Sequence, residues 1–274
     1  MPYELKTLER ALDILLRFDI DHPEWGVTEL HRVAGVPKSV VARVLGVFEA
    51  HGLLKQDPIT RKYRLGIRLF ELGRLVVDQM DLRKAAVPVM SRLAQLTGET
   101  ILLCIEDDYQ QVCIESVSSR QNINLASRPG TRIPLHGGAS AKVLLAFMPL
   151  EERRKCYDKF GLPSFTPYTP TDEKDLEAQL QTIRQCGYAV TFEERDLGTA
   201  GVSAPIADYT GQVIASLSVV GLRPRFTDER IPELVRLVTE TARAISKELG
   251  GPGLGRMTHE QRHERRERNT PEPG

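Results

Sequence analysis

Residues 27–66 read VTELHRVAGVPKSVVARVLGVFEAHGLLKQDPITRKYRLG, in which two helical patterns precede two short strand patterns. Thr28 suits the N-cap of a short helix that ends at Ala34, and Gly35-Val36-Pro37 predicts a tight turn after it. Apolar residues then recur at helical spacing over residues 38–50, so a longer helix follows the turn. The alternating segments LLKQD and RKYRL, separated by PIT, predict a hairpin.

Another helix is predicted upstream, because leucines recur every three or four positions over residues 4–18. Asp19 to Trp25, with Pro23 among them, break this pattern and predict a loop. Three helices with a tight turn before the third, followed by a hairpin, are typical of a winged helix-turn-helix domain. We therefore predict such a domain over residues 1–65.

The distribution of charge indicates that this domain binds DNA. Lys and Arg total 37, as do Asp and Glu, and this neutrality taken alone argues against a nucleic-acid partner. Residues 31–68, however, carry eight basic residues against two acidic ones, a net charge of +6. A compact basic block of this kind can provide the electrostatic footprint for phosphate if its residues converge on one face. The alternative is a three-helix scaffold with incidental surface charge.

The third predicted helix places candidate DNA contacts near its N-terminus, where a recognition helix reaches base edges. Its apolar stripe faces the core, which leaves small and basic side chains on the open face, and two more basic residues occupy the tip of the hairpin. We expect double-stranded operator DNA to be contacted by Thr28, Lys38, Ser39, Ala42, Arg43, Arg61 and Lys62.

Beyond residue 65, helical and strand patterns alternate. Residues 66–80 predict an amphipathic linker helix whose apolar stripe can pair with a second copy, and residues 82–97 predict another helix. Strands interleaved with helices indicate an α/β sensor-type domain over residues 81–249. The expected strands are 100–106 and 111–117, which form a hairpin around Asp108-Tyr109, then 123–127, 188–192, 202–207 and 212–220.

Three more helices are expected in this second domain. One follows Gly137-Gly138-Ala139-Ser140-Ala141 and runs to Phe147, and another begins in the signature Thr169-Pro170-Thr171-Asp172 and ends at Gly187. A closing helix, capped by Thr227, runs to Leu249. Residues 250–274 are rich in Gly, Pro and charge, and we expect a disordered tail there.

Three segments resemble a known family of regulators. Residues 27–66 resemble the DNA-binding domain of IclR-family transcriptional regulators, and RIPLHGGASAKVLLA (132–146) with GYAVTFEERDLGTAGVSAPIADYTGQVIASLSVVG (187–221) resemble its effector-binding domain. The resemblance extends from about residue 5 to 249. It implies an α+β protein with an N-terminal winged helix, a linker helix and a C-terminal GAF-like α/β domain that binds a small metabolite. It also implies a homodimer or homotetramer on palindromic operators, acting as a repressor or an activator.

A candidate effector pocket follows from the glycine-rich segment and from the resemblance. Residues 137–141 expose backbone N–H groups at a helix N-terminus, which favours a carboxylate. The resemblance implies main-chain donors at Ala139 and Ser140, and a lining that includes Thr191, Gly201, Ser218 and Val220. Gly201 and Val220 stand where other members carry polar side chains, which suggests a roomier, less polar pocket for an organic acid, such as an aromatic acid.

Several interpretations of this region stay open. The glycines either bind an anion or only permit close helix–sheet packing, and Arg132 and His136 either neutralise a carboxylate or are structural. Cys104 and Cys113 face each other if the hairpin turns at residues 108–109. They then form either a thiol switch or, as is usual for strand cysteines, small buried hydrophobes.

No metal, cofactor or catalytic group is expected. Residues 259–263 read HEQRH, a literal H-E-x-x-H motif, but they lie in the charged tail with no core around them. The four cysteines form no CxxC pair, and no P-loop or Ser-His-Asp order is present. No apolar run approaches the roughly 18 residues of a membrane span, and the charged start MPYELKTLER is unlike a signal peptide, so we expect a cytoplasmic protein without a membrane partner.

We conclude that the chain is a ligand-responsive transcription factor without catalysis. One alternative is a constitutive DNA-binding regulator whose second domain is purely structural. A further alternative is an enzyme that turns over a small acid and uses the winged helix for targeting. The effector, the operator, the sign of regulation and the choice between dimer and tetramer stay open.

Overall fold

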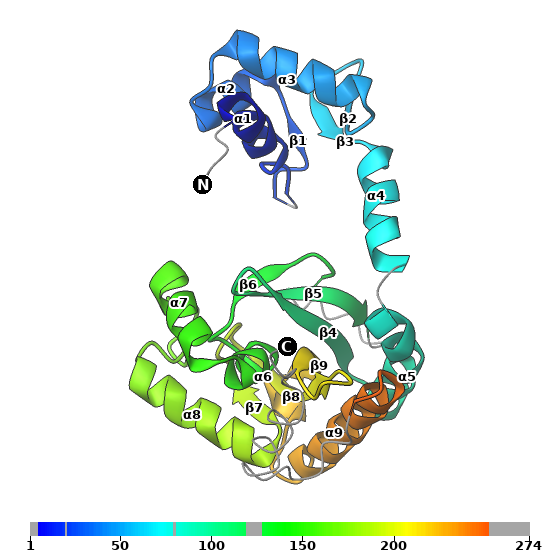
Figure 1. The fold of residues 1–274 in the computed structure, drawn as a ribbon, viewed down its shortest axis with the longest axis vertical. Helices are drawn as coiled ribbons and strands as arrows, with labels where there is room; N and C mark the ends of the chain where they lie inside the picture. The colour runs from blue at the N-terminus through cyan, green and yellow to red at the C-terminus, as the bar shows by residue number, and fades with distance from the viewer. Residues whose placement is uncertain (1–4, 20, 79–80, 119–127, 252–274) are drawn as a thin grey trace, which may run out of the picture. The chain divides into compact units, whose positions relative to one another are not determined.

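The computed structural model describes residues 5–19, 21–78, 81–118 and 128–251, which belong to two compact units, 1–80 and 81–274 (Figure 1). The predicted strand at 123–127, the H-E-x-x-H sequence and all of the tail after residue 251 lie outside the described residues. Within the described ranges, no helix is long and apolar enough to cross a membrane.

The first unit is a winged helix-turn-helix domain followed by a helix, as predicted. Its small antiparallel sheet has the strand order β1-β3-β2, so the wing has three strands, one more than the predicted hairpin. The predicted loop before the second helix ends in the short β1. The elements are α1 (Lys6–Leu15), β1 (Glu24–Trp25), α2 (Val27–Ala34), α3 (Lys38–Ala50), β2 (Leu54–Gln56), β3 (Tyr63–Leu65) and α4 (Ile67–Asp78).

The start of α2 differs from the prediction. Gly26, not Thr28, is the N-cap, and Thr28 lies exposed in the first turn of the helix. The side chain of Glu29 decides this start, because its carboxylate accepts a hydrogen bond from the N–H of Gly26 at 2.8 Å. Such a bond satisfies a backbone donor that the helix itself leaves unpaired.

The core of the first unit fixes the orientation of α3. Ile14 of α1, Leu30 of α2, and Val41 and Leu45 of α3 are fully buried against one another. Because these residues lie on one side of each helix, the opposite side of α3 is left open to solvent, as its apolar stripe predicts.

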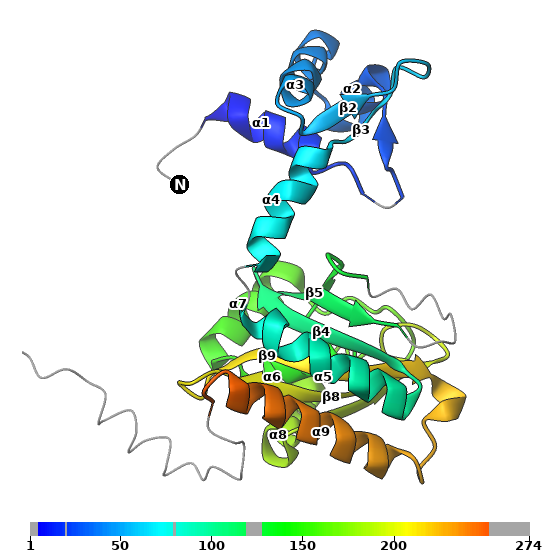
Figure 2. The same cartoon turned by 90° about the vertical axis from the view of Figure 1, so that its right-hand side faces the viewer.

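The second unit is a six-stranded sheet with helices on both faces. The strand order is β6-β5-β4-β9-β8-β7, and every pair is antiparallel, which gives a curled α+β domain. Helices α5 and α9 cover one face, and α6, α7 and α8 cover the other (Figures 1 and 2). The strands are β4 (Thr100–Asp107), β5 (Gln110–Val117), β6 (Arg132–Pro134), β7 (Ala189–Phe192), β8 (Thr199–Ala207) and β9 (Val213–Leu222).

The helices of this unit are partly as predicted. They are α5 (Asp81–Thr97), α6 (Ala139–Phe147), α7 (Leu150–Phe160), α8 (Glu173–Cys186) and α9 (Ile231–Glu248), with a 3₁₀ turn η1 (Arg223–Arg225). The sequence analysis missed α7 and β6. It placed the start of α8 too early, since the carboxylate of Asp172 caps this helix by accepting from the N–H of Asp175 at 3.0 Å.

The predicted start of α9 was also wrong. Thr227 does not cap it. The carbonyl of Thr227 accepts from the N–H groups of Arg230 and Ile231 in a turn, and the helix begins at Ile231. Pro232 fixes this start, because a residue without an N–H group is best accommodated in the first helical turn, where no intrahelical acceptor is available.

The β4–β5 hairpin turns at Asp108-Tyr109, as predicted. Both residues have positive φ, 52° and 62°, which matches the twist that a two-residue hairpin turn requires. The register pairs Cys104 directly with Cys113. A hydrogen bond that the Cys104 thiol donates to Cys113, together with burial, holds the pKa of Cys104 well above its usual value, so Cys104 is a protonated, buried thiol.

Candidate functional site

The open face of α3 presents small and basic side chains together. Lys38, Ser39, Ala42 and Arg43 are all exposed, as is Gly46 one turn further on. Among the described residues, neither Lys38 nor Arg43 has an ion-pair partner. Unpaired cations beside small residues at the start of a helix can approach both phosphates and base edges closely.

The wing places its two basic residues differently. Arg61 is exposed at the tip, where its positive φ of 59° and the Asp57 side chain, which accepts from the N–H groups of Ile59 and Thr60, shape a tight turn. Those two backbone donors lower the pKa of Asp57. The ammonium group of Lys62, by contrast, lies 2.9 Å from a carboxylate oxygen of Glu29, so this lysine joins the wing to α2.

A cavity in the second unit lies between the N-terminus of α6, the sheet and residues 193–201. It opens to solvent, and its volume is about 60 Å³, which is small beside the roughly 300–1,000 Å³ usual for a small-ligand site. Five of the six predicted effector contacts line it: Ala139, Ser140, Thr191, Gly201 and Val220.

The sixth predicted contact lies elsewhere. Ser218 is fully buried and is not among the residues that line the cavity. Its hydroxyl donates to the hydroxyl of Ser203 at 2.9 Å, inside the packing between β8 and β9. The strand that carries Ser218 also carries Val220, so the family pattern located the strand and the structure decides which of its residues reaches the cavity.

The start of α6 is built by two glycines with different requirements. Gly138 has φ 94°, a left-handed conformation that favours glycine, and a Cβ on Gly137 would lie 2.8 Å from the ring of Phe165. Close packing therefore requires Gly137. The N–H of Gly138 donates to the carboxylate of Glu194 at 3.1 Å, so one donor of the predicted anion site is already occupied by the protein's own side chain.

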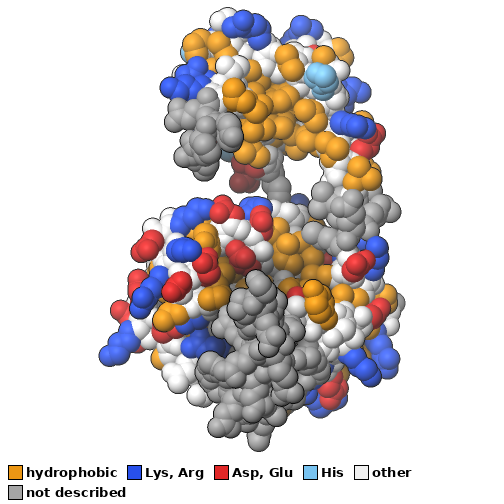
Figure 3. All heavy atoms as spheres, viewed as in Figure 1, with side chains coloured by type: hydrophobic (Ala, Val, Ile, Leu, Met, Phe, Trp, Pro, Cys, Tyr) orange, Lys and Arg blue, Asp and Glu red, His pale blue; other side chains and the backbone are white. Residues whose placement is uncertain are grey.

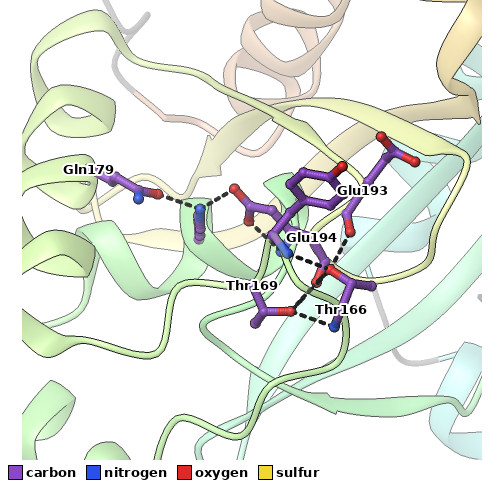
Figure 4. A network of polar contacts seen from close by, with 8 residues as sticks. Thr166, Thr169, Gln179, Glu193 and Glu194 are labelled. Atoms are coloured by element: carbon purple, nitrogen blue, oxygen red, sulfur yellow. Dashed lines mark hydrogen bonds and ion pairs between the residues drawn. The ribbon is translucent and has the colours of Figure 1, made fainter.

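Glu194 is also the partner of a buried lysine. Lys142 is 1% exposed, and its ammonium group contacts the carboxylate of Glu194 and the amide oxygen of Gln179 (Figure 4). Burial lowers the pKa of Lys142, and the adjacent carboxylate partly offsets that shift. The pair fixes the loop after β7 to α6 at the edge of the cavity.

Two threonines hold the same loop through its backbone. The hydroxyl of Thr166 donates to the carbonyl of Glu193, and the hydroxyl of Thr169 donates to the carbonyl of Glu194, each at 2.6 Å (Figure 4). With both its carbonyls and the Glu194 carboxylate bonded, this part of the cavity wall is firmly positioned.

The sequence analysis missed six polar residues that line the cavity: Gln111, Glu193, Glu194, Arg195, Asp196 and Thr199. The guanidinium of Arg195 lies 4.7 Å from the centre of the Phe165 ring and has no ion-pair or hydrogen-bond partner in the described part of the chain. The resemblance gave Thr191 and Gly201 as lining residues, and Arg195 lies in the segment between them, which was the available signal.

The signal for Gln111 was strand alternation. Gln111 is two residues before the buried Cys113 in β5, so both side chains lie on the same face of the sheet, the face that α6 covers. Its amide nitrogen donates to the sulfur of Cys104 at 3.3 Å.

Arg132 and His136 have structural roles. Arg132 forms an ion pair with Asp107 on the neighbouring hairpin. His136 hydrogen-bonds the carbonyl of Pro163 at 2.8 Å and stacks on Phe165, and burial lowers its pKa. Neither residue lines the cavity.

Both units of the chain match models of one protein family. Residues 7–58 match the family model described as the IclR helix-turn-helix domain, and residues 74–247 match the model described as bacterial transcriptional regulator IclR C-terminal. The chain belongs to the IclR family. It is 34% identical over 245 residues to the HTH-type transcriptional regulator KipR of Bacillus subtilis, covering 89% of this chain and 97% of KipR. It is 32% identical to XynR of Escherichia coli, covering 90% and 98%.

Solved IclR structures share the fold. The Thermotoga maritima IclR superposes with a TM-score of 0.74 at 31% identity, covering 90% of this chain and all of that one. An IclR homologue from Microbacterium hydrocarbonoxydans, complexed with 4-hydroxybenzoate, gives a TM-score of 0.78 at 29% identity, covering 89% and 98%. This IclR-family protein is a DNA-binding transcriptional regulator with a C-terminal ligand-binding domain, and its relatives are regulators, not enzymes.

Proposed function

We propose that this IclR-family regulator binds a palindromic operator through α3 and is controlled by a small organic acid held in the cavity of the second unit. The observation that carries the proposal is the pairing of two surfaces in one chain. One is an exposed basic helix face, and the other is a cavity with a helix N-terminus and the guanidinium of Arg195, which has no ion-pair partner among the described residues.

The DNA contacts follow from exposure. Ser39, Ala42 and Arg43 of α3 enter the major groove, and Lys38 and Arg61 neutralise phosphates on either side. Thr28, exposed at the start of α2, donates a hydrogen bond to a phosphate of the DNA backbone. Lys62 contributes less, since Glu29 already neutralises it.

The effector is an organic acid with an apolar body. Its carboxylate pairs with Arg195 and accepts from the free N–H groups of Ala139 and Ser140 in the first turn of α6. Leu102, Ile133 and Val220 provide an apolar wall. The 4-hydroxybenzoate complex of the Microbacterium homologue supports an aromatic acid.

A homo-oligomer is supported by the apolar face of α1. Its leucines are exposed at helical spacing, and Figure 3 shows hydrophobic side chains gathered on this face of the first unit. A second copy fits such a surface, because a palindromic operator needs two winged helices. The exposed residues are Leu5, Leu8, Leu12 and Leu16 of the α1 region, and Ile67, Phe70, Leu72 and Leu75 of α4. Effector binding then acts through α4, the linker helix, on the spacing of the two winged helices.

The test is binding to DNA from the protein's own upstream intergenic region and to an unrelated duplex of equal length, by fluorescence anisotropy across a salt series. We expect affinity at least ~10³-fold tighter for the native region, weakening steeply with salt, and release by the effector. Absence of binding to either duplex at low salt would overturn the proposal. Operator binding that no acid alters, with no hits in a thermal-shift screen, favours a constitutive regulator.

A further inference from the structure

The face of the second unit's sheet that α6 covers carries a row of buried polar side chains. Ser203, Ser216 and Ser218 are all fully buried. The hydroxyl of Ser218 donates to Ser203 at 2.9 Å, Ser203 donates to the carbonyl of Leu217 at 3.1 Å, and Ser216 bonds Ser140 at 2.8 Å. Each of these hydroxyls is therefore satisfied within the protein.

Gln111 is the exception in this row. It is 3% exposed, its nitrogen donates to Cys104, and its oxygen, Oε1, is buried without a hydrogen-bond partner among the described residues. An unsatisfied buried amide oxygen is destabilising, and native proteins contain few such atoms. The neighbouring serines show that the polar side chains next to Gln111 are paired. The unpaired Oε1 of Gln111 therefore calls for a functional explanation.

Gln111 lines the same cavity as Arg195 and the start of α6. It lies on β5, the second strand in the sheet order β6-β5-β4-β9-β8-β7, whereas Thr191 lies on β7, the last strand in that order. Leu102 of β4 and Val220 of β9 line the cavity on the strands between them. The cavity thus has polar groups on separated strands and an apolar floor between them, which fits a ligand with an apolar body and two polar ends.

We propose that Gln111 binds a hydroxyl group of the effector and so selects a hydroxylated organic acid over the same acid without the hydroxyl. This inference rests on the proposed function, in which the acid group pairs with Arg195 and α6. A hydroxyl suits the Gln111 amide in either orientation, because it donates to an oxygen and accepts from an N–H. A site that hydrogen-bonds a ligand hydroxyl rejects the analogue lacking it, since the site's buried polar atom is then left unpaired.

The test uses the full chain and matched acids: benzoate with 3- and 4-hydroxybenzoate, and phenylacetate with 4-hydroxyphenylacetate. Affinities are measured by calorimetry for the wild type, Gln111→Leu and Gln111→Met. We expect at least one hydroxylated acid to bind the wild type about 10-fold more tightly than its parent. Both variants are expected to reduce that ratio to within about twofold while retaining their affinity for the parent acid. Gln110→Leu, on the opposite side of the same strand, is the matched control and is expected to keep the ratio.

Equal binding of the paired acids by the wild type would overturn the role of Gln111, as would a ratio that survives in both Gln111 variants. Retained affinity for the parent acid shows that a variant is folded. If no acid of the panel binds, the effector class itself is wrong. Operator binding, measured separately by anisotropy, then shows whether the DNA-binding part of the proposed function stands.

Discussion

The two units of this protein handle charge in opposite ways. The first unit leaves Lys38 and Arg43 exposed on α3 without ion-pair partners among the described residues. The second unit buries Lys142 almost completely and pairs it with Glu194. An exposed cation is available to a ligand and contributes little to stability, whereas a buried one is costly to disturb and unavailable for binding. Substitution of an exposed cation should therefore weaken DNA binding without changing stability. Substitution of the buried lysine should reduce stability.

The largest effect is expected from Lys142→Met. Removing the ammonium leaves the carboxylate of Glu194 partly buried, without a counter-ion, and a broken buried pair of this kind typically costs about 3–5 kcal/mol of unfolding free energy. Chemical denaturation measures the loss. Lys155→Met, which removes an exposed partner of Glu152, is the control and should change stability far less, because solvent screens an exposed pair. Comparable losses in the two variants would show that burial does not distinguish the pairs.

Arg43→Ala tests the exposed cations of the first unit. We expect operator binding to weaken by about 1–3 kcal/mol, or roughly 5- to 150-fold, because a base-reading arginine is lost, while stability is unchanged. Fluorescence anisotropy and thermal unfolding measure the two effects. Arg154→Ala is the control: this arginine is also exposed, but it lies on α7 of the second unit. If it weakened binding as much as Arg43→Ala, the assignment of α3 as the recognition helix would be wrong.

A smaller effect separates two lysines of the first unit. Lys38→Ala should reduce the salt dependence of operator binding by about one phosphate contact, since Lys38 is free to neutralise a phosphate. Lys62→Ala should change it less, because Lys62 is paired with Glu29 at 2.9 Å in the free protein. The slopes of log affinity against log salt give both numbers. Equal slopes for the two variants would indicate that the Lys62–Glu29 pair opens on DNA.

The same contrast explains what the sequence could predict. The exposed face of α3 follows from helical periodicity around Val41 and Leu45, so the sequence predicted correctly which of its residues are exposed. Lys62 was named as a free contact because its partner Glu29 is 33 residues away, and no local pattern reveals such a pair.

In the second unit, the resemblance located five cavity residues but not the state of their polar groups. That Glu194 occupies the N–H of Gly138 depends on a contact across 56 residues. The unpaired oxygen of Gln111 depends on which neighbours fail to reach it. Both features depend on tertiary packing, which the sequence does not reveal. Only the strand alternation that places Gln111 on the same sheet face as Cys113 was available from the sequence.

The smallest predicted effect concerns a buried group that is uncharged. Burial lowers the pKa of His136 in the folded protein below the usual value near 6.5, so the unfolded chain binds its proton first as the pH falls. The contribution of His136 to stability is therefore complete above about pH 6.5 and is lost as the pH drops further. His136→Gln keeps a donor for the carbonyl of Pro163 but does not titrate, so the variant should gain relative to the wild type between pH 7.5 and pH 5.5.

Denaturation curves at several pH values measure that difference. A constant difference between variant and wild type would mean that His136 binds its proton equally in both states. Its burial against Phe165 would then impose no cost on its charge, contrary to the contrast between the two units. A difference that shrinks on acidification, together with unchanged operator affinity, would show that the buried His136 contributes to stability and not to DNA binding.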